Sequence, residues 1–174
     1  MATVPNPRTW GSTELVTAAK LNADVKDAWT YFLNRPVAIL HRESATEMLI
    51  SGATAVIWTD EILDTDGGHS TVTNPSRYTA QTAGWYFVRA NLRWNAFNPM
   101  PTWMDLTIRK NGSNAQSRST TVNRVNGVGC TSQVQGYVSL AVSDYLEVFA
   151  QPVVSSGRVA AGKAVIVSIE WVSV

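Results

Sequence analysis

The sequence predicts an all-β protein, a jelly-roll β-sandwich of about eight to ten antiparallel strands, preceded by an extended arm and one α-helix. Three observations predict it. From residue 37 onward, short runs rich in β-branched and aromatic residues alternate with turn residues. The preceding residues lack this pattern and combine prolines with a helical periodicity. The length of 174 residues suits one full-sized domain with an extension. We therefore expect an N-terminal arm and anchoring helix over 1–35 and a head over 36–174.

The N-terminal segment is predicted to start extended and to continue as a helix. Pro5 and Pro7 fix their own φ angles and keep the residues before them out of the helical region. Thr17 is a suitable N-cap, and Pro36 closes the segment at the other end. We expect the helix to span residues 17–33.

Apolar residues of this helix recur at alternating steps of three and four, which is heptad spacing. They are Ala18, Leu21, Val25, Ala28 and Phe32. About two heptads are too short to hold a coiled coil alone. The seam therefore packs either on the chain's own head or on copies of itself or a larger assembly. We favour the second interpretation, in which the helix anchors and oligomerises the protein.

Eight runs of the head read as strands, most of them alternating or rich in β-branched and aromatic residues. They are Val37–His41, Ala53–Trp58, Ser76–Thr79, Gly84–Trp94, Trp103–Lys110, Cys130–Ala141, Tyr145–Pro152 and Val165–Val172. Asn111-Gly112 predicts a tight hairpin, because a type I′ turn needs positive φ at both central positions. The polar stretch Ser113–Gly129 is interpreted as a long loop with weak strand character.

The strand Gly84–Trp94 is predicted to have two different faces. Trp85, Phe87 and Arg89 alternate with Tyr86, Val88 and Ala90. Because successive side chains of a strand point to opposite sides, one set can face the core and the other a neighbouring molecule.

Composition indicates an oligomer and argues against several partners. Charged residues make up only 16% of the chain, well below the usual quarter, so part of the surface is expected to be buried against a partner. The net charge is +1 without a basic cluster, which argues against nucleic acid. No apolar run is long enough for a bilayer, and the first residues do not resemble a signal peptide. We expect assembly in a cytoplasm and no membrane partner.

The residues that usually carry catalysis are sparse. The two histidines, His41 and His69, have no metal-ligand spacing, and Cys130 reads as a buried, inert thiol. No nucleophile elbow or phosphate-binding loop is present in the sequence. A depolymerase would need a carboxylate pair, for which Asp105 and Glu147 are available but not brought together by the sequence. We expect no enzymatic activity and no cofactor.

An acidic segment and two tryptophans are the remaining candidate sites. Asp64 and Asp66 before a glycine are candidate calcium ligands, but the spacing of a calcium loop is incomplete, so a solvated turn is favoured and no metal is expected. Trp94 and Trp103 are candidate contacts for a glycan, because aromatic faces stack on sugars.

The N-terminal residues Pro7-Arg-Thr-Trp10, Glu14 to Asn22 and Val25-Lys-Asp27 form a specific combination that no general folding rule requires. This opening resembles that of actinobacteriophage structural proteins, usually tail or minor structural proteins. The resemblance implies that the segment docks on a phage particle, with Pro7, Arg8 and Trp10 in contact with another virion protein.

The head resembles the tumour-necrosis-factor-like jelly roll, and specifically the globular head of the complement first-component family. The residues that carry the resemblance are Asp64–Gly67, Tyr78–Tyr86, Ile108–Gly112, Leu140–Leu146 and Ser168–Trp171. Ala80 and Ser143 depart from the family pattern, which often has Pro and Gly at these positions. The resemblance implies a compact homotrimer with its N-termini gathered at one end.

Together these features predict a non-enzymatic, trimeric phage virion protein, anchored by its N-terminal segment and displaying the head. Capsid decoration or head fibre and tail or tail fibre both remain open. The alternative is a lectin-like module that binds a host glycan or receptor.

Overall fold

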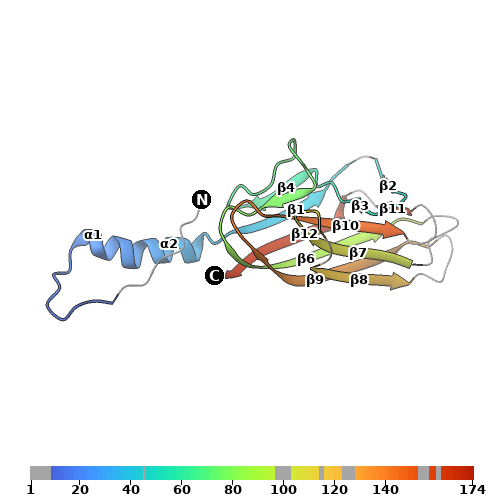
Figure 1. Cartoon of the computed structure of the whole chain (residues 1–174). Helices are drawn as coiled ribbons and strands as arrows, with labels where there is room; N and C mark the ends of the chain where they lie inside the picture. The colour runs from blue at the N-terminus through green and yellow to red at the C-terminus, as the bar shows by residue number, and fades with distance from the viewer. Residues whose placement is uncertain are drawn as a thin grey trace.

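The computed structural model describes residues 9–44, 46–96, 103–113, 116–122, 128–152, 157–159 and 162–174. Two antiparallel β-sheets pack face to face, and a helix projects from one end of the sandwich, where the C-terminus also lies (Figure 1). The described residues contain twelve strands.

The projecting helix has three consecutive parts. α1 (Ala18–Leu21) begins after Thr17, whose hydroxyl accepts a hydrogen bond from the backbone N–H of Lys20 at 3.3 Å, so the predicted N-cap is confirmed. The π-helical turn η1 (Asn22–Lys26) follows, and α2 (Asp27–Leu33) completes the helix.

Sheet A has seven strands in the order β2–β11–β6–β12–β1–β4, with β9 paired to the opposite edge of β6. Its strands are β1 (Val37–Arg42), β2 (Met48–Ile50), β4 (Asp60–Asp64), β6 (Gly84–Trp94), β9 (Cys130–Leu140), β11 (Gly157–Val159) and β12 (Gly162–Ser173). The eleven-residue strand β6 is central: it pairs along its length with β9 on one side and with β12 on the other.

Sheet B has five strands in the order β3–β10–β7–β8, with β5 also paired to β10. Its strands are β3 (Thr54–Ala55), β5 (Arg77–Thr79), β7 (Trp103–Lys110), β8 (Ser117–Val122) and β10 (Tyr145–Pro152). The tight turn predicted at Asn111-Gly112 is confirmed, because these residues have φ angles of 51° and 70°, and the strand that pairs with β7 beyond it is β8.

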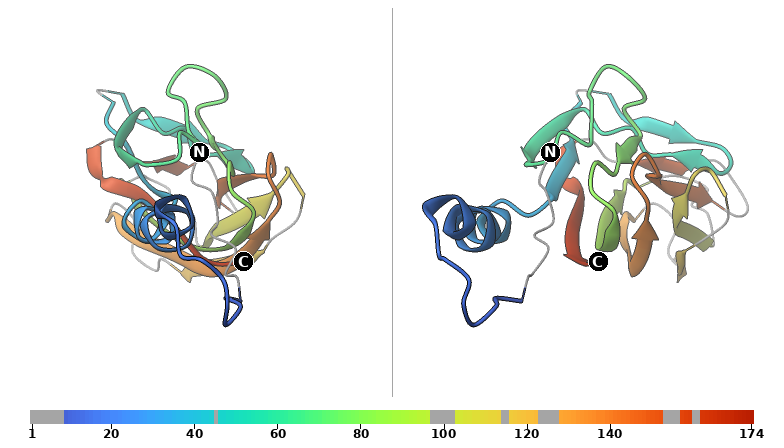
Figure 2. Two further views of the ribbon diagram at one scale, coloured as in Figure 1. Left: turned by 90° about the vertical axis from the view of Figure 1, so that its left-hand side faces the viewer. Right: turned by 60° about the vertical axis from the view of Figure 1, so that its left-hand side comes forward.

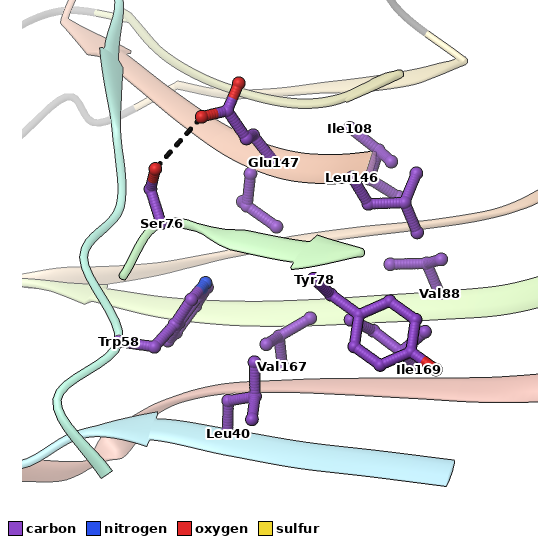
Figure 3. Close-up of a pocket in the computed structure, with 11 residues that line it drawn as sticks. Leu40, Trp58, Ser76, Tyr78, Val88, Ile108, Leu146, Glu147, Val167 and Ile169 are labelled. Carbon is purple, nitrogen blue, oxygen red and sulfur yellow. Dashed lines mark hydrogen bonds between the residues drawn. The ribbon is translucent and has the colours of Figure 1, made fainter. Parts of the chain in front are cut away.

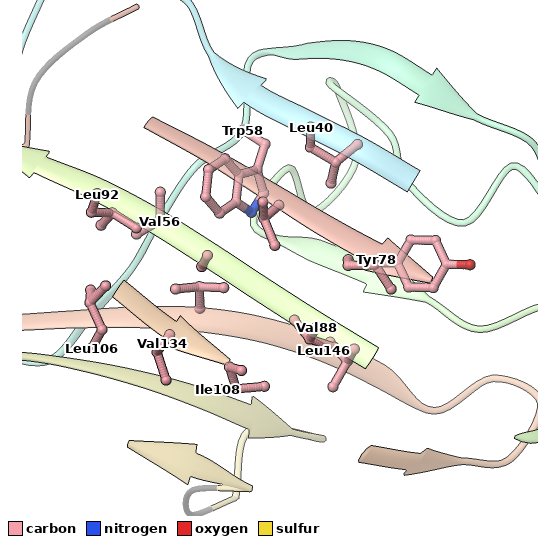
Figure 4. Packing of buried hydrophobic residues seen from close by; sticks show 14 of the residues in the cluster. Leu40, Val56, Trp58, Tyr78, Val88, Leu92, Leu106, Ile108, Val134 and Leu146 are labelled. Carbon is pink, nitrogen blue, oxygen red and sulfur yellow. The ribbon is translucent and has the colours of Figure 1, made fainter. Parts of the chain in front are cut away.

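The core lies between the inner faces of the two sheets. Tyr86, Val88 and Ala90 of β6 are buried there, while Trp85 and Arg89 are exposed on the outer face, as the alternation predicts. Figure 4 shows side chains of both sheets interdigitating around Trp58 and Val88. Burial of each large apolar side chain in such a core stabilises the fold by about 1.5–3 kcal/mol.

Four segments form strands that the sequence analysis does not predict: the three-residue strands β2 and β11, and the longer strands β4 and β8. Asp60–Asp64, interpreted from the sequence as a turn, is the edge strand β4 and pairs with β1. Ser117–Val122, interpreted as part of a long loop, is β8. Both are edge strands with little burial, so neither needs the apolar alternation by which strands are recognised in sequence.

Candidate association surfaces

The first candidate surface is the apolar face of the projecting helix, here called the helix seam: Leu21, Val25, Trp29 and Leu33. All four side chains are exposed in the isolated chain, Trp29 to 65%. Exposed apolar side chains that adjoin one another mark a surface for association.

The π-helical turn changes which residues form this seam. The backbone N–H of Asp27 donates to the carbonyl of Asn22, five residues earlier. Such a turn holds one residue more than an α-helical turn, which rotates the following side chains by roughly 100° around the axis. Trp29 therefore follows Val25 on the seam, next to the predicted Ala28 and Phe32, and the role of the predicted heptad residues in association stays a prediction.

Two residues of the predicted pattern, Ala28 and Phe32, lie beside Trp29 of the seam. Ala28, Trp29 and Phe32 line a shallow hollow of about 220 Å³ whose walls are almost wholly apolar. Phe32 is strongly exposed, whereas Ala28 is half-buried. A large apolar side chain from another molecule would fill this hollow.

The helix touches its own head mainly through one side chain. Tyr31 is the buried residue of the helix, 7% exposed, and its ring meets that of Trp171 edge-on with centroids 5.2 Å apart. Burial, and then the charge of Asp66, raise the pKa of Tyr31 to about 12. Figure 2 (left), which looks toward the end of the helix, shows it standing at one end of the sandwich. The seam is thus not used by the head.

The second candidate surface is aromatic and lies on the outer face of sheet A. Trp85 and Phe87 of β6 point outward, and Tyr137 of the neighbouring strand β9 is 61% exposed. The rings of Phe87 and Tyr137 are in contact, with centroids 5.0 Å apart and planes at 48°. We call Trp85, Phe87 and Tyr137 the aromatic face. Such clusters are enriched at protein interfaces.

The two tryptophans predicted as glycan contacts lie in different environments. Trp103 is 49% exposed, beside exposed Val122 across the β7–β8 pair. Trp94 is fully buried, and its indole N–H donates to the Ser132 hydroxyl at 2.9 Å. The prediction for Trp94 is therefore wrong: a side chain in the core cannot stack on a sugar.

Exposed Trp103 lies at the end of the head opposite the helix. The helix docks on Trp171, which pairs with Tyr86 near the start of β6. At the far end of β6, Trp94 pairs with Cys130, whose sulfur is 3.8 Å from that of Met104. Burial raises the pKa of the Cys130 thiol, which keeps it protonated and unreactive at neutral pH.

The N-terminal residues predicted to dock on another protein are only partly described. Pro7 and Arg8 lie outside the described residues. Trp10 is described and partly exposed.

The candidate calcium ligands serve as hydrogen-bond acceptors within the turn after β4. The Asp64 carboxylate accepts from the backbone N–H groups of Gly67 at 3.0 Å and His69 at 2.8 Å. The Asp66 carboxylate is buried and accepts from the Thr82 hydroxyl at 3.2 Å. These hydrogen bonds give both aspartates a structural role in holding the turn.

The two carboxylates considered for catalysis are far apart. On the β7–β10 ladder Asp105 faces Gln151, four residues from Glu147, which corresponds to about 13 Å. Asp105 is paired with Arg118 and Thr120. Glu147 accepts from Ser76 at 2.9 Å and from Arg77 at 3.3 Å. Neither the distance nor the pairing suits glycoside hydrolysis.

A gap between the sheets adjoins Glu147. Figure 3 shows it lined by core side chains such as Trp58 and Tyr78, with the Ser76–Glu147 hydrogen bond at its rim. Its volume is about 10 Å³, room for about one water molecule and far below that of a ligand pocket. Among the described residues, no helix is long and apolar enough to cross a membrane.

Known proteins match this chain in fold but not in sequence. No protein-family model matches the chain, and no curated protein matches it either. The crystal structure of murine APRIL at pH 5.0 superposes with a TM-score of 0.59 at 13% identity, over 78% of this chain and 99% of that one. The globular domain of zebrafish complement 1qA protein superposes with a TM-score of 0.54 at 10% identity, over 79% of this chain and 98% of that one.

The head is a tumour-necrosis-factor-like jelly roll. The predicted fold class is thereby confirmed, although the identities are far too low to carry over any activity. Within the described residues, the projecting helix and the aromatic face are apolar surfaces that the fold leaves exposed.

Proposed function

We propose that the chain is a homotrimeric, non-enzymatic structural protein whose helix anchors a displayed jelly-roll head. The observation that carries the proposal is the exposed helix seam, with Leu21, Val25 and Trp29 in water in the isolated chain. Complete burial of an exposed apolar side chain is worth about 1.5–3 kcal/mol, and these partly exposed side chains gain a fraction of that free energy when a partner covers them. A short helix that contacts its own head mainly through Tyr31 obtains this burial from other chains.

Trimeric association is supported by the head as well. The aromatic face is a partly exposed patch on sheet A, and the low share of charged residues suits a surface covered by copies of the chain. A closed three-fold arrangement brings three equivalent helices to one end of the assembly, where their seams can meet. The resemblance of the head to trimeric jelly rolls supports the same number.

The place of action is proposed to be a bacteriophage virion. The support is the N-terminal combination from Pro7 to Asp27, which resembles that of actinobacteriophage structural proteins. In this proposal residues 1–35 dock on capsid or tail proteins and the head points outward, as a capsid decoration, head fibre or tail component. The test is to purify phage particles from a host lysate on a density gradient and to label them with an antibody against the head. We expect the antibody to bind the particles, and particles of the encoding phage that do not bind it would overturn the proposal.

A glycan- or receptor-binding role is the second candidate. The supporting observation is exposed Trp103 at the end of the head that faces away from the helix, where a displayed head would meet a cell. Glycan-array binding by the full chain that is lost in Trp103→Ala and kept in Val72→Ala would support it. Val72 is a matched control, since it is exposed and lies outside the aromatic face and the helix seam. No binding by the parent chain would overturn it.

A further inference from the structure

Three metal-ligating side chains meet at the edge of sheet A. His41 of β1 faces Asp60 of β4 directly in the antiparallel register, and Glu43 follows His41 by two residues. The His41 Nε2 atom contacts the Asp60 carboxylate. One ligand atom from each of the three residues lies within 4.8 Å of the others.

The backbone that carries these side chains is fixed by Thr59. The N–H of Glu43 donates to the Thr59 hydroxyl at 2.7 Å, and that hydroxyl donates back to the Glu43 carbonyl at 3.0 Å. The Thr59 N–H donates to the His41 carbonyl at 3.0 Å. The three side chains are thus held near one another before any ligand binds, which lowers the entropic cost of binding.

His41 is the buried member of the three. Its side chain is 3% exposed, and its Nδ1 atom has no hydrogen-bond partner among the described residues. Its Nε2 atom is the ring nitrogen on the side of the Asp60 carboxylate, where a metal ion would be bound. His69 differs, because its Nδ1 faces Glu61 at 2.8 Å and its Nε2 faces the Pro75 carbonyl at 3.2 Å, so both of its ring nitrogens already have partners.

Apart from the contact between Asp60 and His41, the two carboxylates have no cationic partner among the described residues. No Lys or Arg there forms an ion pair with Glu43 or Asp60. The neighbouring Arg42 points elsewhere, and its guanidinium donates to the carbonyls of Ile57 at 3.4 Å and Thr46 at 3.3 Å. An imidazole nitrogen beside two carboxylates that no Lys or Arg neutralises attracts a dication.

We propose that His41, Glu43 and Asp60 bind one divalent transition-metal ion, represented by Zn²⁺, which joins the edge strand β4 to β1. Imidazole nitrogen favours Zn²⁺ and its transition-metal neighbours, whereas Ca²⁺ and Mg²⁺ prefer oxygen ligands alone. Three protein ligands leave a fourth position for water. The exposed side chain of Glu43 rotates to bring its oxygen within the roughly 2.0–2.2 Å of a Zn–O bond. The site does not depend on the proposed virion role.

The test is calorimetric titration of the untagged, chelator-treated full chain with ZnCl₂, together with its melting temperature. We expect one ion per chain and a melting temperature raised by several degrees, since the ion binds only the folded state. In Glu43→Gln and in Asp60→Asn the affinity for Zn²⁺ is expected to fall at least about tenfold, and the rise in melting temperature on adding Zn²⁺ should become smaller. Glu43→Gln is decisive because this exposed side chain has no other described contact, so the variant folds normally.

Two matched variants complete the design. Glu61→Gln removes the carboxylate that faces the other buried histidine and is expected to bind Zn²⁺ like the parent chain, as is Cys130→Ser. Absence of Zn²⁺ binding by the parent chain would overturn the proposal. So would binding that persists in Glu43→Gln and Asp60→Asn, binding that is lost in Cys130→Ser, or an equal response to CaCl₂.

Discussion

The ring of Tyr31 stands edge-on against that of Trp171, at an interplanar angle of 88°. Trp171 is itself held by a hydrogen bond from its indole N–H to the Ala83 carbonyl at 3.1 Å. Gly84 permits this arrangement, since a Cβ atom there would lie 2.3 Å from the indole nitrogen. The helix therefore leaves the jelly roll from a fixed aromatic joint and carries its seam away from the head.

Replacing Tyr31 tests this joint. Tyr31→Ala removes an aromatic contact of about 0.5–1.5 kcal/mol and should free the helix from the head, with faster backbone hydrogen exchange and proteolysis in residues 18–33. Tyr31→Phe should leave the joint intact or stabilise it slightly, because the Tyr31 hydroxyl is buried without a hydrogen-bond partner among the described residues. Equal exchange in both variants would show that the ring contact does not hold the helix.

The shifted seam makes a prediction that separates it from a regular heptad pattern. Trp29→Glu places a charge on the seam and should weaken self-association of the full chain by at least about tenfold, as expected for a buried tryptophan at an interface. Thr30→Glu adds the same charge at the next, exposed position and should change association little. Sedimentation equilibrium measures both. A larger effect in Thr30→Glu would place the seam on another side of the helix.

The aromatic face should contribute to association independently of the helix. Tyr137→Glu introduces a charge on an exposed side chain, so the fold and its melting temperature should change little, while the assembly should dissociate at micromolar concentrations. Val72→Glu, at another strongly exposed apolar residue, is the control. Light scattering over a dilution series reports the result, and an unchanged mass for Tyr137→Glu would remove this face from the interface.

Stability at acid pH should depend on Asp144. Its carboxylate accepts hydrogen bonds from Lys110 at 2.7 Å, Asn111 at 2.6 Å and the Ala141 N–H at 2.7 Å, which lower its pKa from 3.8 to about 2. Because folding favours the ionised form, the stabilisation is complete above about pH 4 and is lost as the pH falls toward 2.

The variant Asp144→Asn isolates this contribution. Its free energy of unfolding should be lower than that of the parent chain at pH 6, and the difference should shrink between pH 4 and pH 2. Urea unfolding at a series of pH values measures the difference. A difference that stays constant down to pH 2 would contradict the assigned role of the ionised carboxylate.

The head could be predicted largely because its central strands bury one face each. In Gly84–Trp94, Trp103–Lys110 and Tyr145–Pro152 the apolar pattern, together with the turn residues beside them, marks both ends of the strand, and the structure has the same bounds. The edge strands β4 and β8 bury too little to leave such a pattern, so they were invisible to this reasoning.

The candidate sites were less predictable, since they depend on register and on contacts between distant segments. Trp94 is separated from Tyr86 and Val88 by even numbers of residues, so on a strand all three point to the same side. This signal in the sequence was sufficient to place Trp94 in the core. The π-helical turn has no such signal, and it adds Trp29 to the exposed apolar side chains near Ala28. The pairing of His41 with Asp60 required strand β4, which the sequence analysis interpreted as a turn.

Trimeric association is the central claim, and the solution mass of the full chain tests it most directly. Light scattering after size exclusion should give about 57 kDa, three times the 19.0 kDa of one chain, at micromolar concentration. A mass of 19.0 kDa under these conditions, or one corresponding to a different number of copies, would contradict the account.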